Sequence, residues 1–164
     1  MLDEHLSVRP LLELEASVLK AFTFEALFVE EGATPYPKEI LEEKALIKYY
    51  SNWGMPGDTA FVLVHNDIIV GVCWTRIFGI ENTGYGFVDE QTPELNIALL
   101  PTYRNQGWGS KLIHCTLESN RLKGYIKVSL SCNTRNPAFQ LYLRLGFQTY
   151  SIKGFSATLI IPLL

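Results

Sequence analysis

The stretch "PTYRNQGWGSKLIHC" (101–115) places two glycines two positions apart, with a basic residue shortly before them and a helical pattern after them. The N-terminus of a helix presents backbone N–H groups without intrahelical partners, together with the positive end of the helix dipole. Glycine in such a turn lets the backbone approach an anion closely. The stretch therefore predicts an anion-binding turn beside the charge of Arg104, unless Gly107 and Gly109 serve only to permit a tight turn.

Three phosphate-binding patterns can be compared with these residues. A nucleotide P-loop reads G-x-x-x-x-G-K-[ST], whereas "GWGSK" (107–111) places serine before lysine and has no glycine at the earlier position. A dinucleotide fingerprint needs a third glycine and a later acidic residue, but Leu112 stands at the glycine position and "KVSLSCN" (127–133) carries no acid. The pattern R-x-x-G-x-G fits from Arg104 to Gly109. The comparison argues against a nucleotide-binding protein.

Hydrophobic periodicity around this turn predicts a succession of helices and strands. β-branched and aromatic residues predict strands on both sides of Asn66 and Asp67, which is a hairpin signal. Asn136 followed by Pro137 fits a helix N-cap with a first-turn proline. The expected helices are 11–32, 38–54, 109–124 and 138–145, and the expected strands are 59–65, 68–78, 94–100, 125–132, 147–152 and 156–164. This order predicts an α/β fold with helices packed on a sheet.

The composition limits the class of protein. The 164 residues suit one domain, 1–164, and 48% hydrophobic with 19% charged residues allows a packed core. A net charge of −3 argues against general attraction to nucleic acid or to an acidic membrane. Residues 1–10 lack a signal-peptide pattern, and no apolar run approaches the roughly 20 residues that span a bilayer, so we expect a soluble, cytoplasmic protein. Neither a disulfide framework nor a zinc site is expected from three scattered cysteines, Cys73, Cys115 and Cys132.

The R-x-x-G-x-G pattern and its neighbours resemble the GNAT superfamily of acyl-CoA N-acyltransferases. "PELNIALLPTYRNQGWGSKLI" (93–113) is similar to the family's central strand, loop and helix, and "VSLSCNTRNPAFQLYLRLGF" (128–147) is similar to its next strand and helix. The resemblance covers nearly the whole chain, and "WGMPGD" (53–58) with "GYGFVDEQTPEL" (84–95) looks like a poorly characterised bacterial branch. It implies a mixed, mostly antiparallel central sheet of about six strands, splayed at the cofactor site, with helices on both faces.

By this resemblance the cofactor is acetyl-CoA (coenzyme A). The backbone of Ile97, Ala98 and Leu99 is expected to pair with the pantetheine arm, and an N–H group near Leu99 could steady the oxyanion on the thioester carbonyl. A plain core strand is the alternative for these residues. The pyrophosphate is expected to bind in the turn and at the following helix, at Arg104, Asn105, Gln106, Gly107, Trp108, Gly109 and Ser110.

Two residues of the next helix have a role in the family and a plain structural alternative. Asn136 matches the position whose amide contacts the cofactor arm, but it is also the helix cap predicted above. Tyr142 matches the tyrosine that lies near the thioester sulfur, where a phenol can donate a proton to the departing thiolate. The alternative for Tyr142 is a core aromatic side chain at helical spacing.

The nucleophile implied by the resemblance is a neutral primary amine that attacks the thioester directly. Deprotonating an alkyl ammonium group with a pKa near 10.4 costs roughly 4–5 kcal/mol at pH 7, so a base or a water chain must help. Glu94, which opens the central strand, is the best carboxylate for this role. Glu90 and Asp89 lie in the preceding loop, and a solvated strand end is the alternative reading of Glu94.

The acceptor is expected to be a small-molecule or peptide amine that contacts the first two helices and the loop 79–93. The side chains that would suit a cationic amine are Glu30, Glu31, Tyr36, Tyr49, Tyr50 and Trp53, although an acidic surface beside core aromatics explains them equally well. A homodimer is left open. A non-catalytic acyl-CoA-binding sensor or interaction module on the same fold is the second hypothesis.

Overall fold

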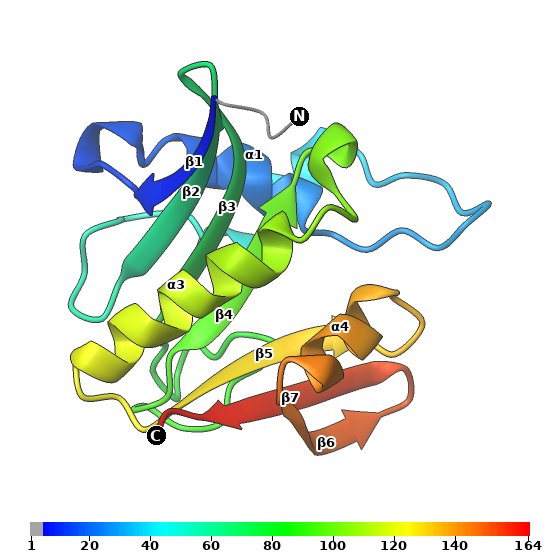
Figure 1. The fold of residues 1–164 in the computed structure, drawn as a ribbon. Helices are drawn as coiled ribbons and strands as arrows, with labels where there is room; N and C mark the ends of the chain where they lie inside the picture. Colours follow the sequence, from blue (N-terminus) through cyan, green and yellow to red (C-terminus); the bar gives the residue numbers. More distant parts are fainter. Residues whose placement is uncertain (1–4) are drawn as a thin grey trace.

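A hairpin across Asn66 and Asp67 lies at the centre of the N-terminal half of the sheet. Both residues have positive φ angles, 51° and 66°, as a tight hairpin turn requires. The computed structural model describes residues 5–164 and places this hairpin in a seven-stranded sheet, drawn in Figure 1. The strands are β1 Leu6–Pro10, β2 Thr59–His65, β3 Ile68–Arg76, β4 Glu94–Leu99, β5 Lys127–Asn133, β6 Gln148–Lys153 and β7 Ser156–Pro162.

The strand order is β1-β2-β3-β4-β5-β7-β6, and only the β4–β5 pair is parallel. The predicted mixed, mostly antiparallel sheet is therefore confirmed, with one strand more than expected. The strand that the sequence patterns missed is β1, which pairs with β2 at the edge of the sheet. Its five residues "LSVRP" contain a proline, which is tolerated at an edge but weakens the sequence signal for a strand.

Helices cover both faces of the sheet, as expected. The helices are α1 Val18–Glu25, α2 Lys44–Ile47, α3 Trp108–Leu122 and α4 Ala138–Arg144, and short 3-10 turns cover Glu13–Glu15, Lys38–Glu42 and Pro101–Tyr103. Leu112 and Ile113 of α3 share one core cluster with Tyr142 of α4, whereas Leu19 and Phe22 of α1 pack with Trp74 in another. In Figure 1, α3 and α4 lie in front of the sheet and α1 lies behind it.

The first two helices are shorter than predicted. Helix 11–32 is reduced to α1 and a 3-10 turn, and helix 38–54 is broken at Glu43, whose ψ of 139° is extended. At its other end the segment leaves the helical path at Asn52, whose φ is 53°, and there the guanidinium of Arg76 donates to the carbonyl oxygens of Lys48, Ser51 and Asn52. Within residues 5–164, no helix is long and apolar enough to cross a membrane.

The two central parallel strands separate beyond their first residues. β4 pairs with β3 over six positions, but it pairs with β5 only where Glu94 lies opposite Ser129. The backbone groups of successive strand residues point to opposite neighbours. Because the N–H of Leu100 donates to Val70 of β3, the backbone groups of Ile97 and Leu99 point toward β5, across the opening. The predicted splay of the sheet is present beside the residues expected to bind the pantetheine arm.

Candidate cofactor and catalytic site

The N-terminal end of α3 carries a run of backbone N–H groups that donate to no acceptor within residues 5–164. Asn105 and Gly107 have positive φ angles, 60° and 87°, which turn the chain sharply before the helix. The N–H of Lys111 donates to the Gly107 carbonyl at 3.3 Å and is the first in the helix to find an acceptor. Across residues 5–164, no oxygen accepts a hydrogen bond from the N–H groups of 105–110. Six donors are thus without a protein acceptor in this part of the structure, at and just before the positive end of a fifteen-residue helix.

Gly107 and Gly109 leave the space beside the backbone of the turn unoccupied by side chains. A Cβ atom added to Gly107 would meet no atom within 4 Å, so packing within the protein does not explain the missing side chain. A Cβ atom added to Gly109 would lie 3.7 Å from Leu99 and 3.8 Å from Ile97, which is ordinary van der Waals contact. Apart from the positive φ of Gly107, the protein alone does not need glycine at these positions. An anion that approaches the backbone would need it.

Arg104 lies beside the turn, with its side chain bonded to the protein. Its Nε donates to the carbonyl of Leu99 at 2.9 Å, and its Nη2 lies 3.4 Å from Glu25 of α1. The guanidinium therefore links the end of β4 to α1 and remains about half exposed. Trp108 is half-buried and packs against the core, and the ammonium of Lys111 lies 5.3 Å from its ring centre.

The three β4 residues divide between two directions. By strand alternation, the backbone groups of Ile97 and Leu99 face the opening between β4 and β5. Ala98 lies opposite Val72 of β3, and its backbone groups face that strand. Pairing with an extended cofactor arm is therefore geometrically open to Ile97 and Leu99, while Ala98 contributes to the core on the α1 side of the sheet.

Tyr142 is a core residue whose hydroxyl is free. Its side chain is 8% exposed and packs edge-on against Phe147, with ring centres 5.8 Å apart. Burial, with a smaller contribution from the Cys132 and Cys73 thiols, raises the pKa of the phenol above its ordinary value. Among the described residues no group is hydrogen-bonded to the hydroxyl. Tyr142 can therefore be both a core side chain and a neutral proton donor.

Asn136 caps α4. Its Oδ1 accepts a hydrogen bond from the N–H of Ala138 at 3.0 Å, which is the cap geometry that the sequence predicts. Its Nδ2 carries no hydrogen bond within residues 5–164. The capping role is confirmed, and a contact from Nδ2 to the cofactor arm stays a prediction.

Glu94 is not a solvated strand end, because its side chain is buried. It is 2% exposed, accepting a hydrogen bond from the Tyr49 hydroxyl at 2.6 Å and another from the Gly86 N–H at 2.8 Å. Burial raises the pKa of the Glu94 carboxyl to about 7, against the opposing effect of these hydrogen bonds and of Lys48. A carboxyl with this pKa can exchange a proton near neutral pH.

The other carboxylates near the start of β4 suit a base less well. Asp89 accepts hydrogen bonds from Thr92 and Gln91 and lies 3.3 Å from the ammonium of Lys127. The Thr92 hydrogen bond is the main cause of a lowered pKa at Asp89. Glu90 is exposed on the loop. Of the three carboxylates, only Glu94 is buried.

Asn96 was not among the predicted site residues. It lies two positions after Glu94 on β4, and its Nδ2 is buried without a hydrogen-bond partner among residues 5–164. Side chains two apart on a strand share a face, so Asn96 points to the same side of the sheet as Glu94. A buried amide group without a partner is uncommon. Nothing in the sequence marks it, because Asn in a strand is recognisable as unpartnered only once its surroundings are known.

Several residues expected to line the acceptor site are occupied within the protein. Tyr50 donates to the Leu41 carbonyl and lies under Lys20, and the Trp53 ring lies under Arg76 at 5.4 Å. Glu30 pairs with Arg135 at 2.7 Å across the chain. The cations that these groups bind in the structure are the chain's own. One face of each ring, Tyr50 and Trp53, therefore already has a cation of the protein beside it.

A cavity of about 590 Å³ lies between α1 and residues 38–42. Phe22 and Leu41 form part of its apolar wall, and Glu25, Glu39 and Glu42 bring carboxylates to it. It reaches Leu100 after β4, six residues beyond Glu94, which is roughly 20 Å along a strand. The cavity fits the expected involvement of the first two helical segments, but it is remote from the buried carboxyl.

Comparison with protein families identifies the fold and this turn together. The model described as Acetyltransferase (GNAT) domain matches residues 56–149, which include β2 to α4 and the turn before α3. The chain belongs to the GNAT acetyltransferase family. No curated protein sequence matches it significantly. The cofactor of GNAT acetyltransferases is acetyl-CoA, and the unbonded N–H groups of 105–110 and the open edge of β4 fit that molecule.

Solved GNAT structures share the whole architecture of this family member. An N-acetyltransferase from Staphylococcus aureus Mu50 superposes with a TM-score of 0.69 at 15% identity, over 98% of this chain and 100% of that chain. A GNAT acetyltransferase from Streptococcus pneumoniae gives 0.67 at 18% identity, over 97% and 99%. The PaiA N-acetyltransferase of Thermoplasma acidophilum, solved in complex with coenzyme A, gives 0.63 at 18% identity, over 96% and 98%. At these identities the likeness shows the fold alone.

Proposed function

We propose that the chain, as one domain over 1–164, transfers an acetyl group from acetyl-CoA to a primary amine. One observation carries the proposal: the six unbonded N–H groups at the head of α3 lie next to the unpaired edge of β4. A diphosphate on those N–H groups would direct an extended arm along Ile97 and Leu99 into the opening of the sheet. When bound, acetyl-CoA supplies a thioester whose carbonyl carbon the amine attacks, so that a C–N bond forms and the C–S bond breaks.

Tyr142 is proposed as the proton donor to the leaving thiolate. Its raised pKa keeps the phenol neutral at physiological pH, and its free hydroxyl has a hydrogen bond to give. The apolar surroundings strengthen such a bond, because charge that develops near a buried donor is poorly screened. The phenol restores its own proton from solvent after the thiol leaves. Tyr142 thus gives its proton to the sulfur as the C–S bond breaks.

Glu94 is proposed as the group that takes the proton from the amine. One lone pair on each of its two oxygens is already used by Tyr49 and Gly86, and the side chain is buried. Each carboxylate oxygen keeps a second lone pair. The proton is therefore expected to reach Glu94 through a bridging water rather than by direct contact. Its pKa of about 7 makes the carboxylate available above neutral pH.

The enclosure of Glu94 also favours the second candidate, a non-catalytic acyl-CoA-binding module. A purely structural role also explains a carboxyl group held by Tyr49 and Gly86, because these hydrogen bonds anchor the loop 84–86 on the sheet. Such a protein would retain the turn at 105–110 and would have no use for a proton donor at Tyr142. The two candidates differ in turnover and agree in cofactor binding.

Release of free thiol from acetyl-CoA in the presence of a panel of amines separates these candidates. The panel contains polyamines, amino acids, peptides with free N-termini and aminoglycosides. Under the proposal at least one amine gives turnover, and Tyr142→Phe lowers kcat by about 10- to 1,000-fold while acetyl-CoA binding stays within about threefold. Cofactor binding with no turnover on any amine would support the binding module. Full activity of Tyr142→Phe would remove the tyrosine from the mechanism.

A further inference from the structure

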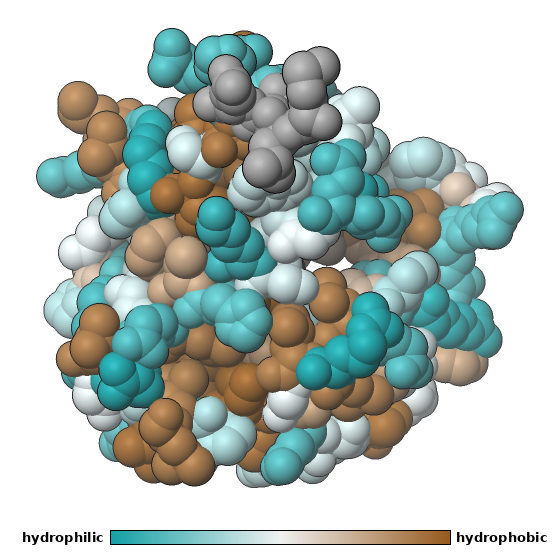
Figure 2. Space-filling model, in the orientation of Figure 1, coloured by the Kyte–Doolittle hydropathy of each residue, from teal (hydrophilic) through white to brown (hydrophobic). Residues whose placement is uncertain are grey.

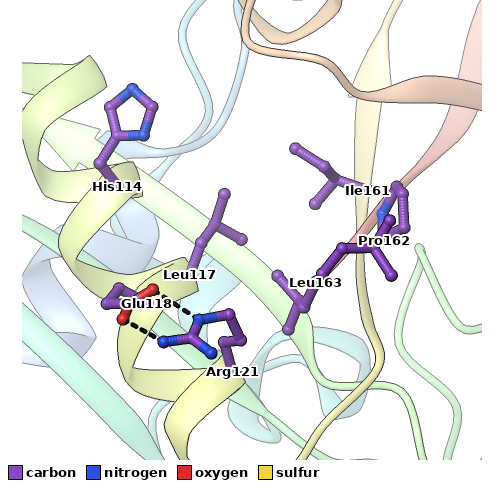
Figure 3. Close-up of a pocket in the computed structure, with 8 residues that line it drawn as sticks. His114, Leu117, Glu118, Arg121, Ile161, Pro162 and Leu163 are labelled. Atoms are coloured by element: carbon purple, nitrogen blue, oxygen red, sulfur yellow. Dashed lines mark hydrogen bonds and ion pairs between the residues drawn. The ribbon is translucent and has the colours of Figure 1, made fainter.

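The groove between α3 and the end of the chain has its charged pair satisfied within the protein. It encloses about 190 Å³, and Figure 3 shows its two walls facing one another across open space. Glu118 and Arg121 on the α3 wall are joined by two hydrogen bonds, at 2.6 and 2.9 Å. Hydrophobic side chains gather over this part of the surface in Figure 2. Because the two charges neutralise each other within one helix, they need no ligand.

Asn96 of β4 differs from this pair, because no partner for its side-chain amide lies within residues 5–164. In the described part of the chain, its Nδ2 is the one buried side-chain nitrogen or oxygen without a hydrogen-bond partner. The residue as a whole is half-buried, so part of it stays accessible to a ligand. A covered amide without a partner is costly to the fold, and proteins retain such a group chiefly where function uses it.

Asn96 lies on the same face of the sheet as the proposed base. Successive side chains of β4 alternate between the two faces. Ile97 packs in the core cluster that contains Tyr142, whereas Ala98 packs in the cluster formed with α1. Glu94 and Asn96 therefore face the α1 side, and Tyr142 lies on the other side. With the proton donor to the thiolate on one side of the opening, the amine is expected to approach from the side of Glu94 and Asn96.

The spacing of Glu94 and Asn96 suits an amine with a hydrogen-bonding group close to it. The two residues are two positions apart, which is about 6.6 Å along a strand. The amine and its bridging water occupy the end of this span nearer Glu94, so a carbonyl on the amine-bearing carbon can reach the amide of Asn96. A half-turn of that amide exchanges Nδ2 with Oδ1 and breaks no hydrogen bond within residues 5–164. The NH2 group can therefore turn toward the substrate.

We propose that Asn96 binds the acceptor by donating a hydrogen bond to the carbonyl oxygen beside the attacking amine, and that the acceptor is the free N-terminus of a peptide. This inference rests on the proposed acetyl transfer and narrows its substrate class. A lysine side chain or a polyamine has only methylene groups at this position and leaves the amide unbonded. A free amino acid brings a carboxylate there, which the Glu94 carboxylate repels.

The proton transfer to Glu94 favours the same class of amine. Burial raises the pKa of the Glu94 carboxyl to about 7. The ordinary pKa is about 7.7–8.0 for an α-amino group and about 10.4 for an alkyl ammonium group. Transfer of the proton to Glu94 is therefore unfavourable by about tenfold or less from a peptide N-terminus, and by more than about a thousandfold from a lysine side chain.

Steady-state kinetics with two matched acceptors tests the role of Asn96. One is an amidated peptide with an N-terminal alanine, and the other is sec-butylamine, which is branched like alanine at the amine-bearing carbon but has no carbonyl. Asn96→Leu should lower kcat/KM by about 10- to 100-fold for the peptide and by less than about threefold for sec-butylamine. Equal losses with both acceptors would show that Asn96 does not read the carbonyl.

Calorimetric titration of the same peptide into protein saturated with coenzyme A measures binding without reaction, because coenzyme A carries no acetyl group. Asn96→Leu should weaken peptide binding by at least about tenfold. Asn96→Asp keeps the shape of the side chain but replaces the donor with a carboxylate, so it should weaken peptide binding as much and leave sec-butylamine binding equal or stronger.

The two measurements separate this inference from the proposed reaction. Peptide binding that depends on Asn96, in a protein without turnover on any amine, would remove the acetyl transfer and keep the peptide site. Turnover of sec-butylamine with no preference for the peptide would keep the transfer and overturn the inference. Wild-type protein that does not bind the peptide, or that binds it no better than either variant does, would also overturn it.

Discussion

Glu94 is the residue whose properties depend most on its surroundings. In the sequence it is a carboxylate at the start of a strand, but in the fold Tyr49, 45 residues away, donates a hydrogen bond to it and the loop 84–86 covers it. A Cβ atom on Gly84 would come within 2.8 Å of the Glu94 oxygens and of the Tyr49 hydroxyl, so only glycine fits there. No local pattern could have shown this burial.

The raised pKa of Glu94 predicts a pH-dependent cost to stability. The folded protein holds this proton up to a pH of about 7, whereas the unfolded chain releases it near the ordinary value of 4.5. The stabilisation is complete below pH 4.5 and is lost as the pH rises through 7. The free energy of unfolding of the wild type should therefore fall by up to about 3 kcal/mol more than that of Glu94→Gln between pH 4.5 and 8. Urea denaturation of both proteins measures the difference, and parallel pH curves would contradict the prediction.

The unpartnered amide of Asn96 predicts an unusual response to mutation. Asn96→Leu removes a buried donor that has no acceptor in the described part of the chain, so the free energy of unfolding should stay equal or rise by about 1 kcal/mol. Asn120 is the matched control, because its amide donates to Thr75 and to the Thr116 carbonyl in a fully buried position. Asn120→Leu should lower stability by about 1–3 kcal/mol. Equal losses in the two variants, measured by chemical denaturation, would mean that Asn96 is bonded in solution.

Among the helices and strands, sequence patterns predicted those features that depend on residues close together in the chain. The β2–β3 hairpin and the caps of α3 and α4 depend on a few neighbouring residues, and Gly107 and Asn136 stand where the sequence places them. The segment 38–54 has a helical apolar pattern, yet only α2 forms within it as α-helix. Arg76 and Asp58, from elsewhere in the chain, bond to the backbone at the end of this segment, between Lys48 and Met55. Tertiary hydrogen bonds to backbone carbonyls have no periodic signal in a sequence.

The buried Arg76–Asp58 ion pair predicts that the free energy of unfolding depends strongly on Asp58. Two hydrogen bonds, at 3.0 and 3.1 Å, join the side chains, which are only 7% and 3% exposed, and Asp58 also accepts from the N–H groups of Gly54 and Met55. Asp58→Ala leaves the Arg76 charge buried without its counter-ion and should lower the free energy of unfolding by about 3–5 kcal/mol. Glu42→Ala breaks an exposed ion pair with Lys20 and should cost less than about 1 kcal/mol. Similar losses in both would contradict the assigned role of burial.

For the whole molecule, the family resemblance predicted the sheet, its splay and the helices on both faces. The stretches that resemble the family contain β4, α3, β5 and α4, so the resemblance predicts how these four elements are arranged. The acceptor region did not follow in the same way. The sequence left a ligand-binding role and a core role equally open for Tyr50 and Trp53, because Lys20 and Arg76, which lie over their rings, are distant along the chain.

The central claim is that the bare amides before α3 hold the diphosphate of coenzyme A, and calorimetric titration of one matched pair of variants tests it. Gly107 and Gly124 lie at opposite ends of α3, with φ angles of 87° and 93° and open space around an added Cβ. Asparagine tolerates this backbone region, so Gly107→Asn and Gly124→Asn should both fold. The account predicts that Gly107→Asn weakens coenzyme A binding by at least about tenfold, while Gly124→Asn binds like the wild type. Wild-type affinity in Gly107→Asn would contradict it.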